Sequence, residues 1–140
     1  MLKSMTLYKS SGILKYSIAS YGYKLVMEID KQISEYYRSL MPKYIKTNRQ
    51  MYAPHVSVVR KEIPVNLQYW GKYEGEEVDF YYDNTVHYGK VYCWLNVFCK
   101  RLEEIRTELG LSVDSPYTLP PEETGCVKCF HTTIGNFKGL

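Results

Sequence analysis

Several features that would place a protein in a broad class are missing from this sequence. No stretch approaches the ~20 consecutive apolar residues of a membrane-spanning helix. The first fifteen residues, "MLKSMTLYKSSGILK", hold no run of about 7–15 apolar residues before a small-residue cleavage site. We therefore expect a soluble, cytoplasmic protein that has no signal peptide and does not contact a membrane.

Motifs for bound phosphate chains and metals are scarce as well. The sequence has no glycine-rich phosphate loop, which argues against a nucleoside triphosphatase. No cluster of carboxylates or histidines stands at ligand spacing, so we expect neither a metal nor any other cofactor. The pair in "CVKC" (Cys126 and Cys129) has no second pair of zinc-site spacing, because Cys93 and Cys99 lie too far apart. We interpret all four cysteines as buried thiols, with metal binding at 126–129 as the alternative.

The composition indicates one globular domain over 1–140. Tyrosine is the unusual component, with 15 copies, and serves cores, interfaces and base-stacking surfaces alike. The net charge of +3 suits an anionic ligand but is smaller than that of a protein that binds duplex DNA. A small charged ligand fits this balance better than a long one.

Hydrophobic periodicity predicts both helices and strands along the chain. We expect helices over about 31–41, capped by Asp30, and over 99–109, followed by Gly110 as the C-terminal glycine. A loop is predicted over 61–75, and a proline-containing segment, 116–121, leads into the last strand. Strands are predicted over 12–20, 23–29, 51–59, 77–89, 90–98 and 127–135.

The two halves of the chain repeat one order of elements. Strand 23–29 is followed by a helix and by a strand that contains His55. Strand 90–98 is followed by a helix and by a strand that contains His131. This order predicts two related strand–helix–strand units, although the sequences have diverged too far to prove a duplication.

Both histidine-containing strands carry the pattern His-x-Ser/Thr. In "PHVSVV", His55 and Ser57 share one face of a strand, and in "CFHTTIGN" His131 and Thr133 do so. The residues between them are apolar or would face the core. Ordinary polar positions in a sheet could also produce the pattern, but two of the three histidines carry it, one in each half.

Two imidazoles beside two hydroxyls suit the cleavage of a phosphodiester. A neutral histidine takes a proton from water or from a ribose 2′-hydroxyl, and a protonated one gives a proton to the leaving oxygen. The hydroxyls of Ser57 and Thr133 can donate to the non-bridging phosphate oxygens. The residues alone leave open which histidine is the acid and which the base.

These motifs resemble those of the 2H phosphoesterases, also called LigT-like. "PHVSVV" and "FHTTIGN" are similar to the paired signature of that family, and "RLEEIRTELGL" to the helix before its second motif. The resemblance implies a bilobal α+β fold with pseudo-twofold symmetry, with lobes over about 12–60 and 76–137 around a central cleft. It also implies activity on 2′,3′-cyclic phosphates, on 2′–5′ or 3′–5′ linkages, or on cyclic nucleotides, with His55, Ser57, His131 and Thr133 as catalytic residues.

The small size is similar to that of viral members that degrade the cyclic oligonucleotide signals of bacterial CBASS immunity. We therefore expect a cyclic oligonucleotide as substrate. Trp94 and His87 are assigned to the core and to a surface or hairpin position, respectively. Candidates for stacking on a base are Tyr69, Trp70, Tyr16 and Tyr88, and candidates for phosphate contact are Arg60 and Lys138.

Three other functions stay open at this point. Processing of RNA ends that carry a 2′,3′-cyclic phosphate needs the same four residues. A nucleotide-binding module without activity would not need both imidazoles. A structural or interaction protein with tyrosines on its surface would leave the paired motif unexplained. The oligomeric state cannot be read from the sequence.

Overall fold

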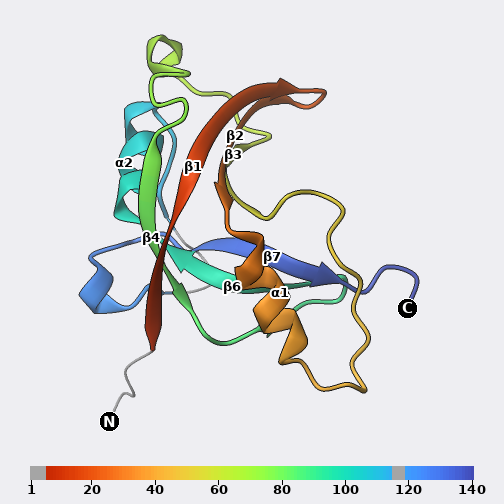
Figure 1. Cartoon of the computed structure of the whole chain (residues 1–140). Helices are drawn as coiled ribbons and strands as arrows, with labels where there is room; N and C mark the ends of the chain where they lie inside the picture. The colour runs from red at the N-terminus through yellow and green to blue at the C-terminus, as the bar shows by residue number, and fades with distance from the viewer. Residues whose placement is uncertain (1–5, 115–118) are drawn as a thin grey trace.

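The computed structural model describes residues 6–114 and 119–140, which form one antiparallel sheet with helices packed on it (Figure 1). The helices are α1 (Lys31–Ser39) and α2 (Lys100–Glu108), with short 3₁₀ turns η1 (Leu67–Tyr69) and η2 (Glu122–Thr124). The strands are β1 (Leu7–Ala19), β2 (Gly22–Ile29), β3 (His55–Arg60), β4 (Glu77–Asp83), β5 (His87–Tyr88), β6 (Tyr92–Phe98) and β7 (Phe130–Asn136). The predicted α+β class is confirmed.

The strands lie in the order β4-β1-β2-β3-β7-β6-β5. β4 pairs with β1 on one side and also with β6, through Tyr82 opposite Val97, so the sheet curves until it closes on itself. β3 and β7, which carry the two motifs, are neighbours near the middle of this order. The topology therefore brings together two segments that are far apart in the sequence.

Both helices end close to where the sequence predicts. The Asp30 side chain caps α1 by accepting a hydrogen bond from the backbone N–H of Gln32 at 2.9 Å. Gly110 follows α2 with φ of +82°, the left-handed conformation that a C-terminal glycine adopts without strain. These local signals operate within a few residues, which is why the sequence alone reveals them.

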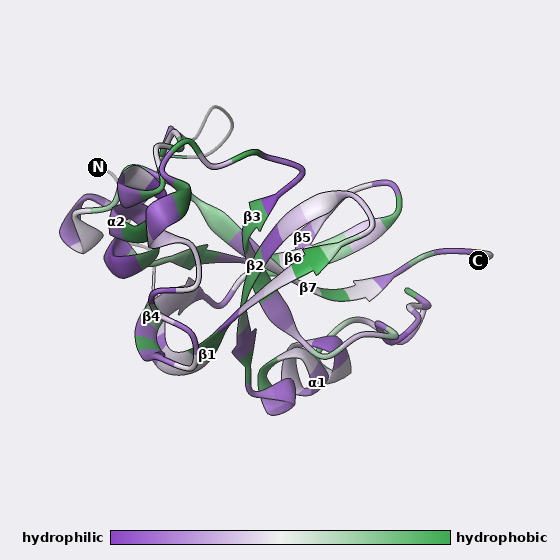
Figure 2. Cartoon of the chain, turned by 90° about the horizontal axis from the view of Figure 1, so that it is seen from above, coloured by the Kyte–Doolittle hydropathy of each residue, from purple (hydrophilic) through white to green (hydrophobic). Residues whose placement is uncertain are grey.

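The two helices cover different parts of one face of the sheet, which we call the core face (Figure 2). α2 buries Leu102, Ile105 and Leu109 against a cluster that includes Val56 and Phe130. Each fully buried side chain of this size contributes about 1.5–3 kcal/mol of transfer free energy. A second cluster packs Tyr37 of α1 and the following Met41 against the sheet residues Cys93, Leu95 and Ile134.

The predicted repeat of strand, helix and strand is present as β2-α1-β3 and β6-α2-β7. Each unit carries a β-bulge at the same distance from its histidine. In the pairing of β2 with β3, Val58 of β3 has no partner residue. In the pairing of β6 with β7, Ile134 of β7 has none. Both of these residues lie three positions after the histidine of their strand. Because a bulge bends a strand and redirects its side chains, both motif strands change direction at the same distance from their histidine.

Several predicted boundaries were wrong. β1 begins at Leu7 and not at residue 12, and β3 begins at His55 and not at residue 51. Segment 77–89 divides into β4 and the short β5, because the chain leaves the sheet between them. Part of the predicted proline-containing segment 116–121 lies outside the described residues. None of the helices in the described ranges has both the length and the apolar character that crossing a membrane requires.

Candidate active site

The register between β3 and β7 brings the two His-x-Ser/Thr motifs together. Val56 pairs with Thr132 in this antiparallel pair, and both residues are buried on the core face. On either side of this pair, the same antiparallel register sets His55 opposite Thr133 and Ser57 opposite His131. All four side chains project from the other side of the sheet, which we call the motif face.

A hydrogen bond orients the ring of His55. Its Nδ1 lies 2.8 Å from the backbone carbonyl oxygen of Ala53. A carbonyl oxygen only accepts, so Nδ1 carries the proton of this bond. Nε2 is therefore the ring nitrogen of His55 that exchanges a proton with a bound molecule.

The surroundings of His131 favour its neutral form. Desolvation by the protein is the largest cause that lowers the pKa of His131, although solvent still reaches the ring. The positive charge of His55, when it is protonated, lowers this pKa further, as do the charges of Lys128 and Arg60. The two imidazoles thus lie close enough to influence each other electrostatically.

Neither hydroxyl of the motifs is occupied by the protein. Ser57 and Thr133 are half-buried, and among the described residues neither hydroxyl has a hydrogen-bond partner. Hydroxyls in this state can donate to a ligand without first breaking a protein contact. The four motif residues His55, Ser57, His131 and Thr133, which we call the quartet, therefore offer two ring nitrogens and two hydroxyls from one surface.

Arg60 lies on the motif face, as a phosphate contact would require. Its strand partner is Lys24, and Ser57 is the partner of Val26, so Arg60 and Ser57 share a face across the bulge. The Arg60 guanidinium lies 5.7 Å from the ring centroid of Tyr21. Lys138, the other predicted cation, follows the end of β7, and its ammonium lies 5.2 Å from the ring centroid of Tyr92, which shares its face of β6 with Trp94.

Three of the predicted base-stacking residues pack on the core face. Tyr16 pairs with the buried Leu25, and its ring meets that of Trp70 edge to face at 4.9 Å. Trp70 and Tyr69 both pack against the buried cluster of α2. Sequence reasoning placed them near the motifs because they follow β3 in the chain, but the loop turns toward the core face, where their apolar area is buried.

Tyr88 also faces away from the motifs. It pairs with Cys93, whereas its neighbour His87 pairs with Trp94, so the two residues of β5 lie on opposite faces. The Tyr88 ring stacks on Phe137 with centroids 6.3 Å apart. Tyr88 is thus placed beside the C-terminal end of β7 rather than beside the quartet.

Trp94 was assigned to the core, and this assignment is wrong. It is half-buried and pairs with Thr133, which sets it on the motif face. Its ring meets that of His131 at a centroid distance of 6.3 Å and an interplanar angle of 63°. A tryptophan in a strand that is apolar on nearly both sides gives no local signal of its face, and only the pairing of Trp94 with Thr133 reveals it.

Sequence reasoning also missed two charged residues near the quartet. Glu28 pairs with His55 across β2 and β3, and its carboxylate lies 3.1 Å from the ammonium of Lys15. Lys128 precedes β7, and desolvation together with the charge of Arg106 lowers the pKa of its ammonium. Strand alternation marks Glu28 as facing away from Met27, but only the pairing of β2 with β3 shows that it neighbours a histidine.

The cysteines near the second motif differ from their prediction. Cys126 and Cys129 are half-buried rather than buried, and both precede β7. Desolvation raises the pKa of the Cys129 thiol to about 11 and also raises that of Cys126. Among the described residues, no three His, Cys, Asp or Glu side chains are grouped so that they could hold a metal ion.

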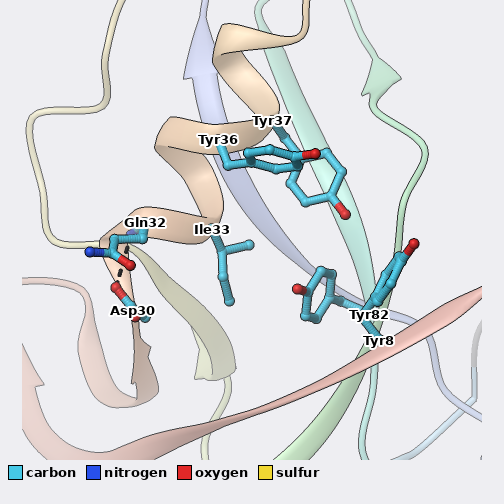
Figure 3. Close-up of a pocket in the computed structure, with 7 residues that line it drawn as sticks. All are labelled: Tyr8, Asp30, Gln32, Ile33, Tyr36, Tyr37 and Tyr82. Atoms are coloured by element: carbon cyan, nitrogen blue, oxygen red, sulfur yellow. Dashed lines mark hydrogen bonds between the residues drawn. The ribbon is translucent and has the colours of Figure 1, made fainter.

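A tyrosine-lined pocket of about 430 Å³ lies beside α1, on the side of the sheet opposite the quartet. Tyr36 and Tyr37 of α1 line it together with Tyr8 and Tyr82 of the sheet, and Asp30 lies near the start of the helix (Figure 3). Desolvation raises the pKa of Tyr37 to about 12. None of the four motif residues lines this pocket.

The chain matches no protein-family model, no curated protein sequence and no solved structure. The functional argument therefore depends on the geometry of the quartet and its neighbours.

Proposed function

We propose that the protein is a metal-independent phosphodiesterase that uses His55 and His131 as an acid–base pair. One observation carries this proposal: the register of β3 and β7 sets two His-x-Ser/Thr motifs side by side on one face. Two imidazoles and two free hydroxyls on adjacent strands match what in-line displacement at phosphorus needs. The electrostatic effect of His55 on His131 supports a shared site.

In this proposal His131 is the base and His55 the acid. The lowered pKa of His131 favours the neutral ring, which can take a proton. The carbonyl oxygen of Ala53 accepts from Nδ1 of His55 and stabilises the protonated ring as well as the neutral one. Nε2 of His55 then holds the proton that the leaving group receives.

The bond changes follow from these roles. His131 removes the proton of a ribose 2′-hydroxyl, and the 2′-oxygen forms a bond to the adjacent phosphorus. The bond from phosphorus to the 5′-oxygen breaks, and His55 gives its proton to that oxygen. The products are a 2′,3′-cyclic phosphate and a free 5′-hydroxyl. When water is the nucleophile, the same two proton transfers open a cyclic phosphate.

Ser57 and Thr133 stabilise the phosphorane-like transition state by donating to its non-bridging oxygens. Arg60 shares the motif face, and Lys128 lies within electrostatic reach of His131. Their charges attract the anionic substrate and offset the charge that develops on the phosphoryl oxygens. The net charge of +3 agrees with such a ligand.

The proposal includes the bilobal 2H phosphoesterase fold, with lobes over about 12–60 and 76–137. The repeated strand–helix–strand units support it, as do the bulges at matching positions in β3 and β7. The motif face would then be the floor of the central cleft between the lobes.

Cyclic oligonucleotides, such as those of CBASS immunity, stay the predicted substrates, with viral evasion of that immunity as the role. The geometry supports the reaction class more than this substrate, because Tyr16, Tyr69 and Trp70 pack on the core face. RNA-end 2′,3′-cyclic phosphates are the second candidate, since the quartet suits them equally.

The test is an incubation in EDTA with 2′,3′-cyclic AMP, a 2′–5′ dinucleotide, and cyclic di- and trinucleotides of 3′,3′ and 2′,3′ linkage. His55→Ala and His131→Ala are assayed beside the wild type, with Thr107→Ala on the exposed side of α2 as a control. Turnover that both histidine variants lose and the control retains supports the proposal. The substrate that is cleaved then distinguishes cyclic oligonucleotides from RNA-end 2′,3′-cyclic phosphates. Binding without turnover by the wild type would leave a nucleotide-binding module instead.

A further inference from the structure

A fully buried carboxylate lies beside the second motif and has no part in the proposed chemistry. Asp83, at the end of β4, is 0% exposed. Its Oδ1 accepts from the backbone N–H of Asn96 at 3.2 Å, and its Oδ2 lies 2.8 Å from Nε2 of His87. Burying a carboxylate costs several kcal/mol unless charged or strong donors satisfy it, so this position needs both partners.

Asn96 connects this carboxylate to the tryptophan of the motif face. The indole Nε1–H of Trp94 donates to Oδ1 of Asn96 at 3.2 Å. Since Trp94 can only donate, this bond orients the Asn96 amide, which is itself 4% exposed. Nδ2 of Asn96 then points toward Nε2 of His87, at 3.1 Å.

Nε2 of His87 can make only one of these two hydrogen bonds: protonated, it donates to Asp83, and unprotonated, it accepts from Asn96. A ring nitrogen that donates to Asp83 has no lone pair left to accept from Asn96. The contact with Asp83 is shorter and involves a carboxylate, so Nε2–H of His87 donates there. Nδ2 of Asn96 then lies near this nitrogen without donating to it. The ring of His87 is held by Asp83 and by stacking on Trp94, with centroids 6.1 Å apart.

The network ends at His131. In the β6–β7 register Asn96 pairs with His131, and Trp94 pairs with Thr133. The Trp94 ring lies between those of His87 and His131, stacked on the first and edge to face with the second. A chain of contacts thus runs from a buried charge to one imidazole of the quartet.

The first motif has no such support. Glu28 occupies the place beside His55 that Asn96 occupies beside His131, but its side chain is 38% exposed and pairs with Lys15. The ring of His55 is held instead by the carbonyl oxygen of Ala53. For His131, no hydrogen bond to a described residue orients the ring, so its position depends on packing.

We propose that Asp83, His87, Asn96 and Trp94 form a positioning network that holds the imidazole of His131 toward the substrate. This inference rests on the proposed function, in which His131 is the base. These four are positioning residues, because they act on His131 and not on the reacting atoms. A misplacement of a catalytic group by about 1 Å can reduce a rate by 10²-fold.

Two variants test the network while keeping the buried carboxylate paired. His87→Gln retains an N–H donor for Asp83 but removes the ring that stacks on Trp94. Trp94→Phe retains an aromatic edge for His131 but removes the donor to Asn96. Tyr88→Phe is the matched control, because Tyr88 neighbours His87 on β5 and faces away from the motifs.

The readout is the ring resonances of His131 and His55 in NMR spectra recorded over a pH titration. We expect both network variants to shift the pKa of His131 and to leave the ring resonances of His55 nearly unchanged. The kcat should fall about 10-fold with little change in KM, as for other residues that orient a catalytic group. Tyr88→Phe should match the wild type in both measurements.

An unchanged pKa of His131 in both variants would overturn the network, whatever their thermal stability. This result is distinguishable from a failure of the proposed function. If the wild type cleaves no phosphodiester, the titration of His131 still shows whether the network positions its ring.

Discussion

Val56 of β3 and Thr132 of β7 pair across the middle of the sheet, and this pairing aligns the two motifs. Their side chains are buried on the core face, so the residues on either side of them project from the motif face. A shift of the register by one residue would turn one motif into the core. The quartet therefore depends on the register in which Val56 and Thr132 are buried opposite each other.

Loss of either imidazole should nearly abolish turnover. We expect His55→Ala and His131→Ala each to reduce kcat by about 10²–10⁴-fold, the usual contribution of general acid–base catalysis. The double variant should be little worse than the worse single one, because the two transfers act as a unit. Steady-state kinetics in EDTA, with the substrate that the wild type cleaves, measure the losses in kcat. Additive losses would contradict a shared proton-transfer site.

The hydroxyls should matter less than the rings. Removing a donor to a charged transition state costs about 10²–10³-fold in kcat where that donor is fully engaged. We expect Ser57→Ala and Thr133→Val to approach this range, with KM little changed. Both residues are half-buried and have no described partner, so the fold should persist. A rise in KM alone would show that they bind the ground state instead.

Activity should persist at pH values where an ordinary histidine is protonated. The pKa of His131 is lowered, so this base stays neutral below its usual value of about 6.5. The acid limb of kcat/KM against pH should therefore have its midpoint below about 6.5. An acid limb above this value would contradict His131 as the base.

The charge of Lys128 should contribute to the low midpoint of this acid limb. Its positive charge is one of the causes that lower the pKa of His131. Lys128→Ala should raise this pKa and move the acid limb to higher pH, and the effect should weaken as added salt screens the charge. Lys31→Ala, at the start of α1, is the control and should leave the limb in place. Equal profiles for all three proteins would rule out this electrostatic effect.

The glycine after α2 should be hard to replace. In Gly110→Ala, a left-handed residue gains a Cβ, which costs about 1–2 kcal/mol, and this Cβ would lie 2.8 Å from Cβ of Val65. Gly75 has a similar φ of +78° but no atom within 4 Å of an added Cβ. Gly75→Ala should therefore cost only the backbone term, and Gly110→Ala more. Urea denaturation measures both, and equal losses would show that the contact with Val65 relaxes freely.

The sequence by itself determined the local features of this protein. Asp30 caps α1 and Gly110 ends α2, because capping depends on residues within one turn. Alternation within a single strand set His55 beside Ser57 and His131 beside Thr133. These relationships extend over a few residues, so the neighbouring residues in the sequence suffice to predict them.

Only the tertiary structure decided which residues surround the motifs. The pairing of β3 with β7 joins segments about 76 residues apart, and no local preference specifies it. The bulge at Val58 turns Arg60 to the motif face, and the register of β6 with β7 sets Trp94 beside the quartet. The loop after β3 instead carries Tyr69 and Trp70 to the core face. Strand pairing and burial are decided by the summed packing of the whole domain. The chemistry of the motifs is thus readable from the sequence, while their neighbourhood exists only in the fold.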